Sequence, residues 1–138
     1  MKTATQLRNE EFLRRCIGIF EKDHKEGRIS TLPDIIARAT AMQPHSHYLS
    51  YDTASRRLHR IMRYGLENEI KEDLVREMWA EILEQVKTCM SSTPPKSFDK
   101  ALSFVLNFCR PSRFYISYDT AKRIISPNRA LYLYRTRC

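Results

Sequence analysis

Apolar residues recur every three or four positions along most of the chain, the spacing of helices that bury one face. The pattern is clearest over residues 5–26, where the apolar positions share one helical face and charged residues lie opposite. Gly27 is a natural stop for this helix. The apolar face of this predicted amphipathic helix consists of Phe12, Leu13, Cys16, Ile17, Ile19 and Phe20.

Capping side chains, glycine and proline divide the rest of the chain into five more predicted helices. Each of them is expected to begin at a residue with a hydroxyl or amide side chain that can cap the helix: Ser30–Thr31, Ser50, Asn68, Ser97 and Ser117. Each closes at a helix-breaking position: Pro44, Gly65, the run 91–95, Pro111 and Ser126–Pro127. The sequence therefore predicts an all-α fold.

One phrase of the sequence occurs twice. Residues 48–58 read Tyr-Leu-Ser-Tyr-Asp-Thr-Ala-Ser-Arg-Arg-Leu, and residues 115–125 read Tyr-Ile-Ser-Tyr-Asp-Thr-Ala-Lys-Arg-Ile-Ile. The helices that begin in this phrase, residues 50–65 and 117–125, are the phrase helices. An identical five-residue run is most unlikely to recur by accident in so short a chain, so the phrase indicates an internal repeat.

The repeat extends beyond the phrase at the same offset. Matching positions include Ser30 with Ser97, Ile35 with Leu102, Ala39 with Leu106, Met42 with Cys109, and Pro44 with Pro111. A small slip also aligns the long helices, pairing Phe12 with Leu74, Cys16 with Met78, and Phe20 with Ile82. We expect a tandem duplication of a three-helix unit, residues 1–66 and 67–138, the second with a Tyr/Arg-rich tail. Three small helices alone are marginally stable, which favours one compact bundle with a shared core.

The chain is basic, with 24 Lys and Arg against 16 Asp and Glu, a net charge of +8. This excess favours a polyanionic partner, nucleic acid first. It is concentrated on and after the third helix of each half. The first phrase helix has four arginines against Asp52, and residues 110–138 have seven basic residues against Asp119.

This layout resembles the helix-turn-helix class of DNA-binding domains over residues 30–64 and 97–126. In that class the last helix of a three-helix unit enters the major groove and nearby side chains contact phosphates. The connection 43–49 is longer than the usual tight turn and holds no glycine. The resemblance implies nucleic-acid contacts by Tyr51, Ser55, Arg56, Arg57, Arg60, Arg63, Arg113, Tyr118, Lys122, Arg123 and Arg129.

The same residues have a purely structural interpretation. Ser-Tyr-Asp-Thr-Ala is a well-made helix start, with a capping serine, an acid near the positive end of the helix dipole and a small residue for close packing. The arginines can equally form a solvated face. Tyr48 and Tyr115, beside the caps, suit packing more than base stacking.

Catalytic and cofactor chemistry find little support in the sequence. The three glycines form no phosphate-cradling loop, and no local motif assembles a nucleophile, a base and an orienting group. His45 and His47 form a pair without a neighbouring third ligand, so we expect no metal. The four cysteines form no CxxC pair, and Cys16 and Cys109 lie in apolar patterns typical of buried free thiols. We therefore expect a non-enzyme without a cofactor.

Two functional hypotheses remain. The first is a small DNA-binding protein, a transcriptional or mobile-element regulator. The second is a non-enzymatic helical interaction or adaptor module whose basic face meets an acidic protein. The N-terminus lacks a signal-peptide pattern and no stretch has the length of a membrane span, so we expect a cytoplasmic protein without a membrane partner.

Overall fold

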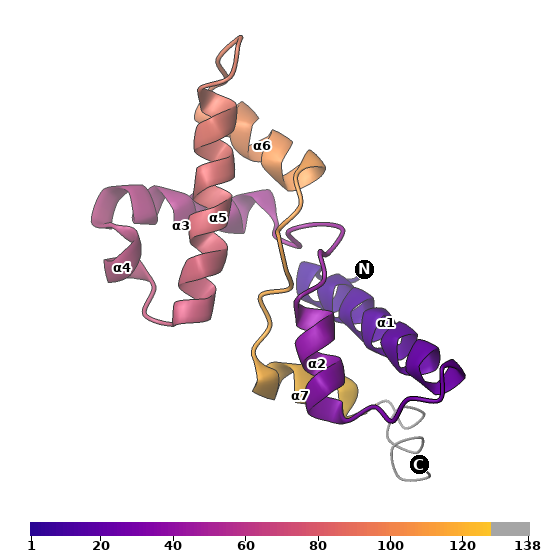
Figure 1. Cartoon of the computed structure of the whole chain (residues 1–138). Coiled ribbons are helices and arrows are strands. Elements are labelled where there is room, and N and C mark those ends of the chain that lie inside the picture. The colour runs from indigo at the N-terminus through magenta and orange to yellow at the C-terminus, as the bar shows by residue number, and fades with distance from the viewer. Residues whose placement is uncertain (128–138) are drawn as a thin grey trace. The chain divides into compact units, whose positions relative to one another are not determined.

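The computed structural model describes residues 1–127 of the chain, and within that range every regular element is a helix. The predicted all-α fold is confirmed. Arg129 and the Tyr/Arg-rich tail lie outside the described residues. The helices, shown in Figure 1, are α1 (Ala4–Lys25), α2 (Leu32–Thr40), α3 (Tyr51–Tyr64), α4 (Leu66–Glu69), α5 (Asp73–Met90), α6 (Phe98–Phe108) and α7 (Tyr118–Ile125).

Side-chain caps set most of the helix starts. Ser50, Ser97 and Ser117 each accept a hydrogen bond from the backbone N–H three residues later, as predicted. At the start of α2 the cap is Thr31, whereas Ser30 donates its hydroxyl to Asp23 Oδ2 at 2.7 Å. Such caps satisfy N–H groups that have no partner inside the helix, so the starts are local properties of the sequence.

The predicted cap at Asn68 is wrong. Gly65 ends α3 with φ +93°, a short helix α4 follows, and Asn68 donates its side-chain amide to the Tyr64 carbonyl at 2.8 Å. Ile70 then adopts an extended conformation, and its side chain is buried. The helix is therefore interrupted at Ile70, and the long helix α5 begins only at Asp73.

The helices group into two compact units that differ from the predicted halves 1–66 and 67–138. Unit 1 is Met1–Pro44 together with the described residues from Ser112 to Pro127, and unit 2 is His45–Pro111. Unit 1 therefore contains α1, α2 and α7, and unit 2 contains α3, α4, α5 and α6. Each unit takes its phrase helix from the other half of the sequence, so the predicted unit of three contiguous helices is wrong.

Long connections make this exchange possible. Ten residues join α2 to α3 and nine join α6 to α7. Because an extended chain spans about 3.3 Å per residue, each connection can reach roughly 30 Å. The tight turn of a usual helix-turn-helix would instead keep the third helix on its own pair.

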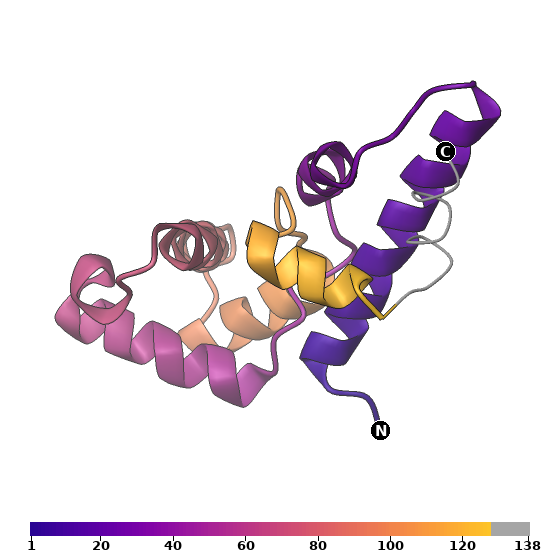
Figure 2. The same ribbon diagram turned by 90° about the horizontal axis from the view of Figure 1, so that it is seen from below.

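The core of unit 1 lies between α1, α2 and the segment that ends in α7. Phe114 packs edge-on against Phe12, with ring centroids 5.5 Å apart, and its backbone N–H donates to the Thr40 carbonyl at 3.0 Å. In Figure 2 α2 is seen end-on, and it lies against both α1 and α7. The buried apolar residues are Phe12, Cys16, Ile19, Phe20, Leu32, Ile35, Ile36, Ala39, Phe114, Ile116, Ala121 and Ile125.

The core of unit 2 is arranged like that of unit 1. Its middle helix is α6, which lies against both α5 and α3. His47 is buried beside this core, and its Nε2 is 2.6 Å from Gln85 Oε1 on α5. The buried apolar residues are Ala54, Leu58, Ile61, Ile70, Trp79, Ile82, Val86, Ala101, Leu102 and Val105.

Candidate nucleic-acid interface

The two phrase helices have the same local structure. In each, the N-cap serine hydroxyl also donates to a threonine hydroxyl, Ser50 to Thr53 at 2.8 Å and Ser117 to Thr120 at 3.0 Å. The alanine that follows, Ala54 or Ala121, is fully buried in the core of its unit. The repeated phrase therefore serves first as a cap and a packing contact.

Basic side chains project from the opposite faces of both phrase helices. Arg56 and Arg60 on α3, and Lys122 and Arg123 on α7, are all exposed. The buried positions of these helices, such as Leu58 and Ile125, face the unit cores. These four predicted cations are therefore accessible, on two helices that belong to different units.

An acid occupies part of the predicted cationic surface of α3. Arg60 Nε donates to both carboxylate oxygens of Glu69, at 3.1 and 3.2 Å, and Arg57 Nη1 lies 3.8 Å from the same carboxylate. Glu69, in α4, has a side chain that is only 10% exposed. Arg57 and Arg60 therefore connect α3 to α4, and their charge is partly neutralised inside unit 2.

The remaining α3 arginines keep their charge. Arg56 Nε is 3.4 Å from the Asp52 carbonyl, and the Arg63 guanidinium lies 5.2 Å from the centre of the Tyr64 ring. Neither makes an ion pair with an acidic side chain of the described residues. Of the four predicted arginines on α3, these two are best placed to meet an external anion.

Two uncharged predicted contacts on α3 are engaged within unit 2. The Tyr51 hydroxyl donates to Asp99 Oδ1 at 2.7 Å, and this bond to a carboxylate raises the pKa of Tyr51. Ser55 accepts through its backbone carbonyl from His59 Nδ1 at 2.7 Å. The His59 ring meets Phe98 edge-on, with centroids 4.6 Å apart. These residues hold α3 against the start of α6, so Tyr51 would have to leave Asp99 to donate its hydroxyl to DNA.

The predicted residues of α7 make fewer polar contacts within their unit than those of α3. The Lys122 ammonium lies 5.6 Å from the centre of the exposed Tyr118 ring, a cation–π contact. Lys122 and Arg123 form no ion pair with any acid in the described part of the chain. A cation–π contact with Tyr118 leaves the ammonium protons of Lys122 available to other acceptors.

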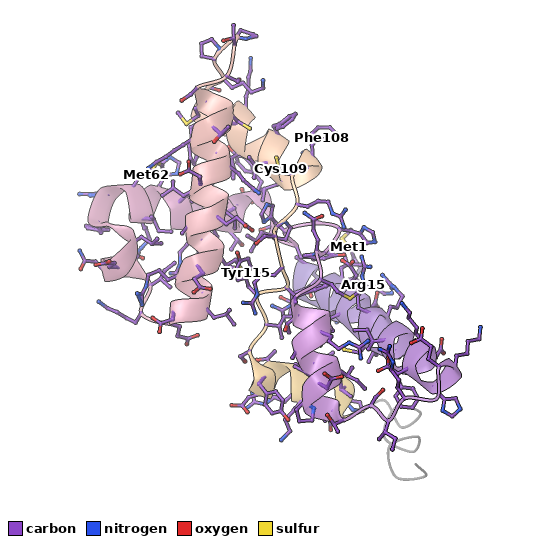
Figure 3. The ribbon with its side chains drawn as sticks, in the orientation of Figure 1. Met1, Arg15, Met62, Phe108, Cys109 and Tyr115 are labelled. Carbon is purple, nitrogen blue, oxygen red and sulfur yellow. The ribbon has the colours of Figure 1, made fainter. Side chains whose placement is uncertain are left out.

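Arg113 lies just before α7 and is half-buried. Its guanidinium is 5.6 Å from the centre of the Tyr115 ring, and its Nε is buried without a hydrogen-bond partner among the described residues. Figure 3 shows Tyr115 on the segment that leads to α7. A buried donor without an acceptor is costly, so Arg113 is constrained by packing. Its prediction as a surface phosphate contact therefore has less support than the predictions for Arg56 and Arg123, which are exposed.

Sequence reasoning missed a second basic surface, in unit 1. A hollow between α1 and α2 is lined by Arg14, Arg15, Gly18, Ile19, Lys22, Arg38 and Met42. These cations come from two helices and are interspersed with acids such as Glu21 and Asp23. No local run marks them, and only the spacing of Arg14, Gly18 and Lys22 at four-residue intervals could have indicated a shared face.

Buried ionisable groups support the fold of each unit. Asp23 in unit 1 accepts from Arg38 at 2.6 and 3.1 Å and from Ser30, and these bonds lower the pKa of Asp23 to about 2. In unit 2, burial lowers the pKa of His47 despite its bond to Gln85. Burial also raises the pKa of the Cys16 thiol to about 12, which makes this predicted buried thiol unreactive. Cys109 is only half-buried.

Residues 1–127 bring together no group of three or more His, Cys, Asp or Glu side chains that could hold a metal ion. In the same range no helix combines the length and apolar character needed to cross a membrane. In comparisons with known proteins, no family model, curated protein or solved structure matches the chain.

Proposed function

We propose that this chain binds duplex DNA through α3 and α7, as a small transcriptional or mobile-element regulator would. The observation that carries the proposal is the exposure of Arg56, Lys122 and Arg123 without acidic partners among the described residues. The net charge of +8 supports the same partner, because exposed cations bind phosphates by releasing condensed counterions. Arg63 extends the basic surface of α3.

The test compares the wild type with the variant Arg56→Ala/Lys122→Ala/Arg123→Ala. Fluorescence anisotropy measures the affinity of each protein for duplex DNA over a series of salt concentrations. The wild type should bind tightly at low salt and weaken steeply as salt rises. If each cation meets one phosphate, the triple variant should lower the slope of log K against log salt by about 2.7, since each contact contributes about 0.9. Circular dichroism should show unchanged helix content.

A charge-matched control separates specific contacts from net charge. The variant Arg28→Ala/Lys71→Ala/Lys87→Ala removes the same charge from exposed positions outside the phrase helices. It should bind nearly as well as the wild type. Equal losses of DNA affinity in both variants would rule out α3 and α7 as the binding surface. If the wild type binds no duplex at low salt, the proposal of DNA binding is wrong.

One observation favours the alternative function, a helical interaction module. Phe104 and Phe108 are 40% and 75% exposed on α6, with ring centroids 5.2 Å apart, and Lys96 Nζ lies 5.6 Å from the Phe104 ring centre. Figure 3 shows Phe108 projecting from the end of α6. Exposed aromatic pairs beside a cation suit an amphipathic acidic protein surface. Failure to bind DNA would make this function the better one.

We also infer that the sequence arose by tandem duplication, with an alignment of the long helices different from the expected one. Arg15 on α1 donates to the Gln43 carbonyl at 3.5 Å, and Gln85 on α5 donates to the Arg110 carbonyl at 3.0 Å. Gln43 and Arg110 each precede a matching proline. These contacts favour pairing Arg15 with Gln85, which aligns four fully or almost fully buried residues, Phe12 with Ile82 and Cys16 with Val86.

A further inference from the structure

Gly18 lies in the interior of α1, where neither the backbone nor the packing requires a glycine. The positive-φ glycines are Gly27 and Gly65, and Gly18 is not among them. A Cβ added at Gly18 would meet nothing within 4 Å. Since glycine weakens a helix interior relative to alanine, folding gives no reason for it here. The bare backbone at Gly18 leaves open space on the surface of unit 1.

Cations surround this open space. Arg14 and Lys22 lie one turn before and one turn after Gly18, on the same face of α1, and both are exposed. Arg38 reaches the same hollow from α2, and Arg15 also lines it. The hollow therefore collects N–H donors from two helices around a stretch of uncovered backbone.

Two of the three acids that accompany these cations are buried. Arg38 is held by Asp23 and Arg15 by Glu11, and the two carboxylate side chains are only 3% and 2% exposed. Asp34, whose side chain is 54% exposed, also pairs with Arg38, at 3.1 Å. These pairs fix the two guanidinium groups while leaving the buried carboxylates away from solvent.

Arg14 and Lys22 complete the donor set. Neither makes an ion pair with an acid of the described residues. The surface of the hollow is therefore cationic, with Ile19 and Met42 as its apolar part.

We propose that this hollow binds a phosphate of the nucleic-acid backbone, which approaches α1 directly over Gly18. A phosphate matches the donors, and Ile19 and Met42 suit the apolar edge of the adjacent sugar. A glycine allows close approach of a ligand to the protein backbone, whereas any side chain would fill the space. The inference rests on the proposed DNA binding and adds to it a sequence-independent contact in unit 1.

The test compares Gly18→Leu with the wild type in the same duplex-binding assay. Leucine suits a helix interior and projects into open space, so the melting temperature should stay equal or rise. Binding should nevertheless weaken roughly tenfold, equally for duplexes of different sequence, as loss of a phosphate contact predicts. Ala80→Leu is the matched control, because Ala80 is an exposed helical position on α5. It should leave binding unchanged.

A second variant tests the same site without a change at position 18. Arg14→Ala/Lys22→Ala removes the two unpaired cations and should lower the salt slope by about 1.8. If folded Gly18→Leu and Arg14→Ala/Lys22→Ala both bind like the wild type while the α3/α7 triple variant loses binding, the hollow is not a phosphate site and the proposed function stands.

Two further outcomes are decisive. Failure of the wild type to bind any duplex at low salt would overturn the proposed function, and this inference with it. Inorganic pyrophosphate serves as a probe of the free anion. If it binds the wild type as tightly as duplex does and Gly18→Leu abolishes its binding, a free phosphate compound is the ligand rather than the nucleic-acid backbone, which contradicts the proposal.

Discussion

Units 1 and 2 use the same phrase helix in different surroundings. In unit 2, Arg57 and Arg60 of α3 meet Glu69, and Tyr51 meets Asp99. In unit 1 the basic residues of α7 have no such acidic partner within residues 1–127, and Lys122 lies instead over the Tyr118 ring. The phrase thus determines where a helix begins, whereas the neighbouring helices determine how much of its charge is available to a ligand.

The largest expected effect is the loss of stability when a buried side chain is shortened in one core or the other. Leu58→Ala in α3 and Ile125→Ala in α7 each remove a fully buried side chain, at a cost of about 2–5 kcal/mol. Trp79 is the single tryptophan and lies in the core of unit 2. Leu58→Ala should shift the denaturation midpoint seen by Trp79 fluorescence.

Ile125→Ala should instead shift mainly the circular dichroism transition, because Ile125 packs with α1 and α2 in unit 1. The chain should then unfold in two steps that fluorescence and dichroism resolve. If Ile125→Ala moves the Trp79 transition and Leu58→Ala does not, the phrase helices belong to their own sequence halves and the exchange is wrong.

Acid should weaken the units in different pH ranges. Burial depresses the pKa of His47, so the unfolded chain binds more protons just below pH 6.5 and unit 2 loses stability as pH falls below about 6.5. The pKa of Asp23 is lowered to about 2, so unit 1 keeps this contribution until pH falls from about 4 toward 2. Urea denaturation across this pH range, followed by Trp79 fluorescence and dichroism, measures both.

His47→Phe is the corresponding variant, since phenylalanine occupies the matching position 114 of unit 1. It should flatten the pH dependence of unit 2 near pH 6 and leave that of unit 1 unchanged. A persistent loss of Trp79-detected stability near pH 6 in this variant would assign the titration to another group.

The smallest expected effect comes from removing the acidic partner of α3, which leaves its arginines, like the basic residues of α7, without an ion pair among residues 1–127. Glu69→Gln removes the carboxylate that faces Arg57 and Arg60, which should tighten duplex binding and increase the salt slope by up to about 1.8 if both arginines then meet phosphates. Stability should change by less than about 1 kcal/mol, because Arg60 is 64% exposed and exposed ion pairs contribute little. Anisotropy and urea denaturation measure the two effects, and unchanged DNA affinity would place Arg57 and Arg60 outside the interface.

Local chemistry made much of the fold predictable. The first helix, expected over residues 5–26, is found at Ala4–Lys25, and the serine caps at 50, 97 and 117 are as expected. The prediction failed at Asn68, because the extended, buried Ile70 interrupts the chain between α4 and α5, and Asn68 lies within α4. Exposure of the basic faces was also predictable, since amphipathic helices bury their apolar positions.

Contacts between distant residues could not be predicted in the same way. Glu69 follows Arg60 by nine residues and reaches it only because Gly65 turns the chain and α4 folds back. The hollow around Gly18 combines α1 with Arg38 of α2. Neither arrangement follows from helical spacing, since each depends on the path of the chain between elements.

The sequence by itself determined the helices, their caps and the sides on which charge gathers, because these depend on residues within one or two turns of each other. Tertiary structure decided which helix pair each phrase helix completes. Both pairs offer an apolar face to a helix with the same buried alanine, and connections of nine and ten residues are long enough to reach either one. The packing of Phe114 against Phe12 and the hydrogen bond of His47 with Gln85 mark the arrangement that the chain adopts.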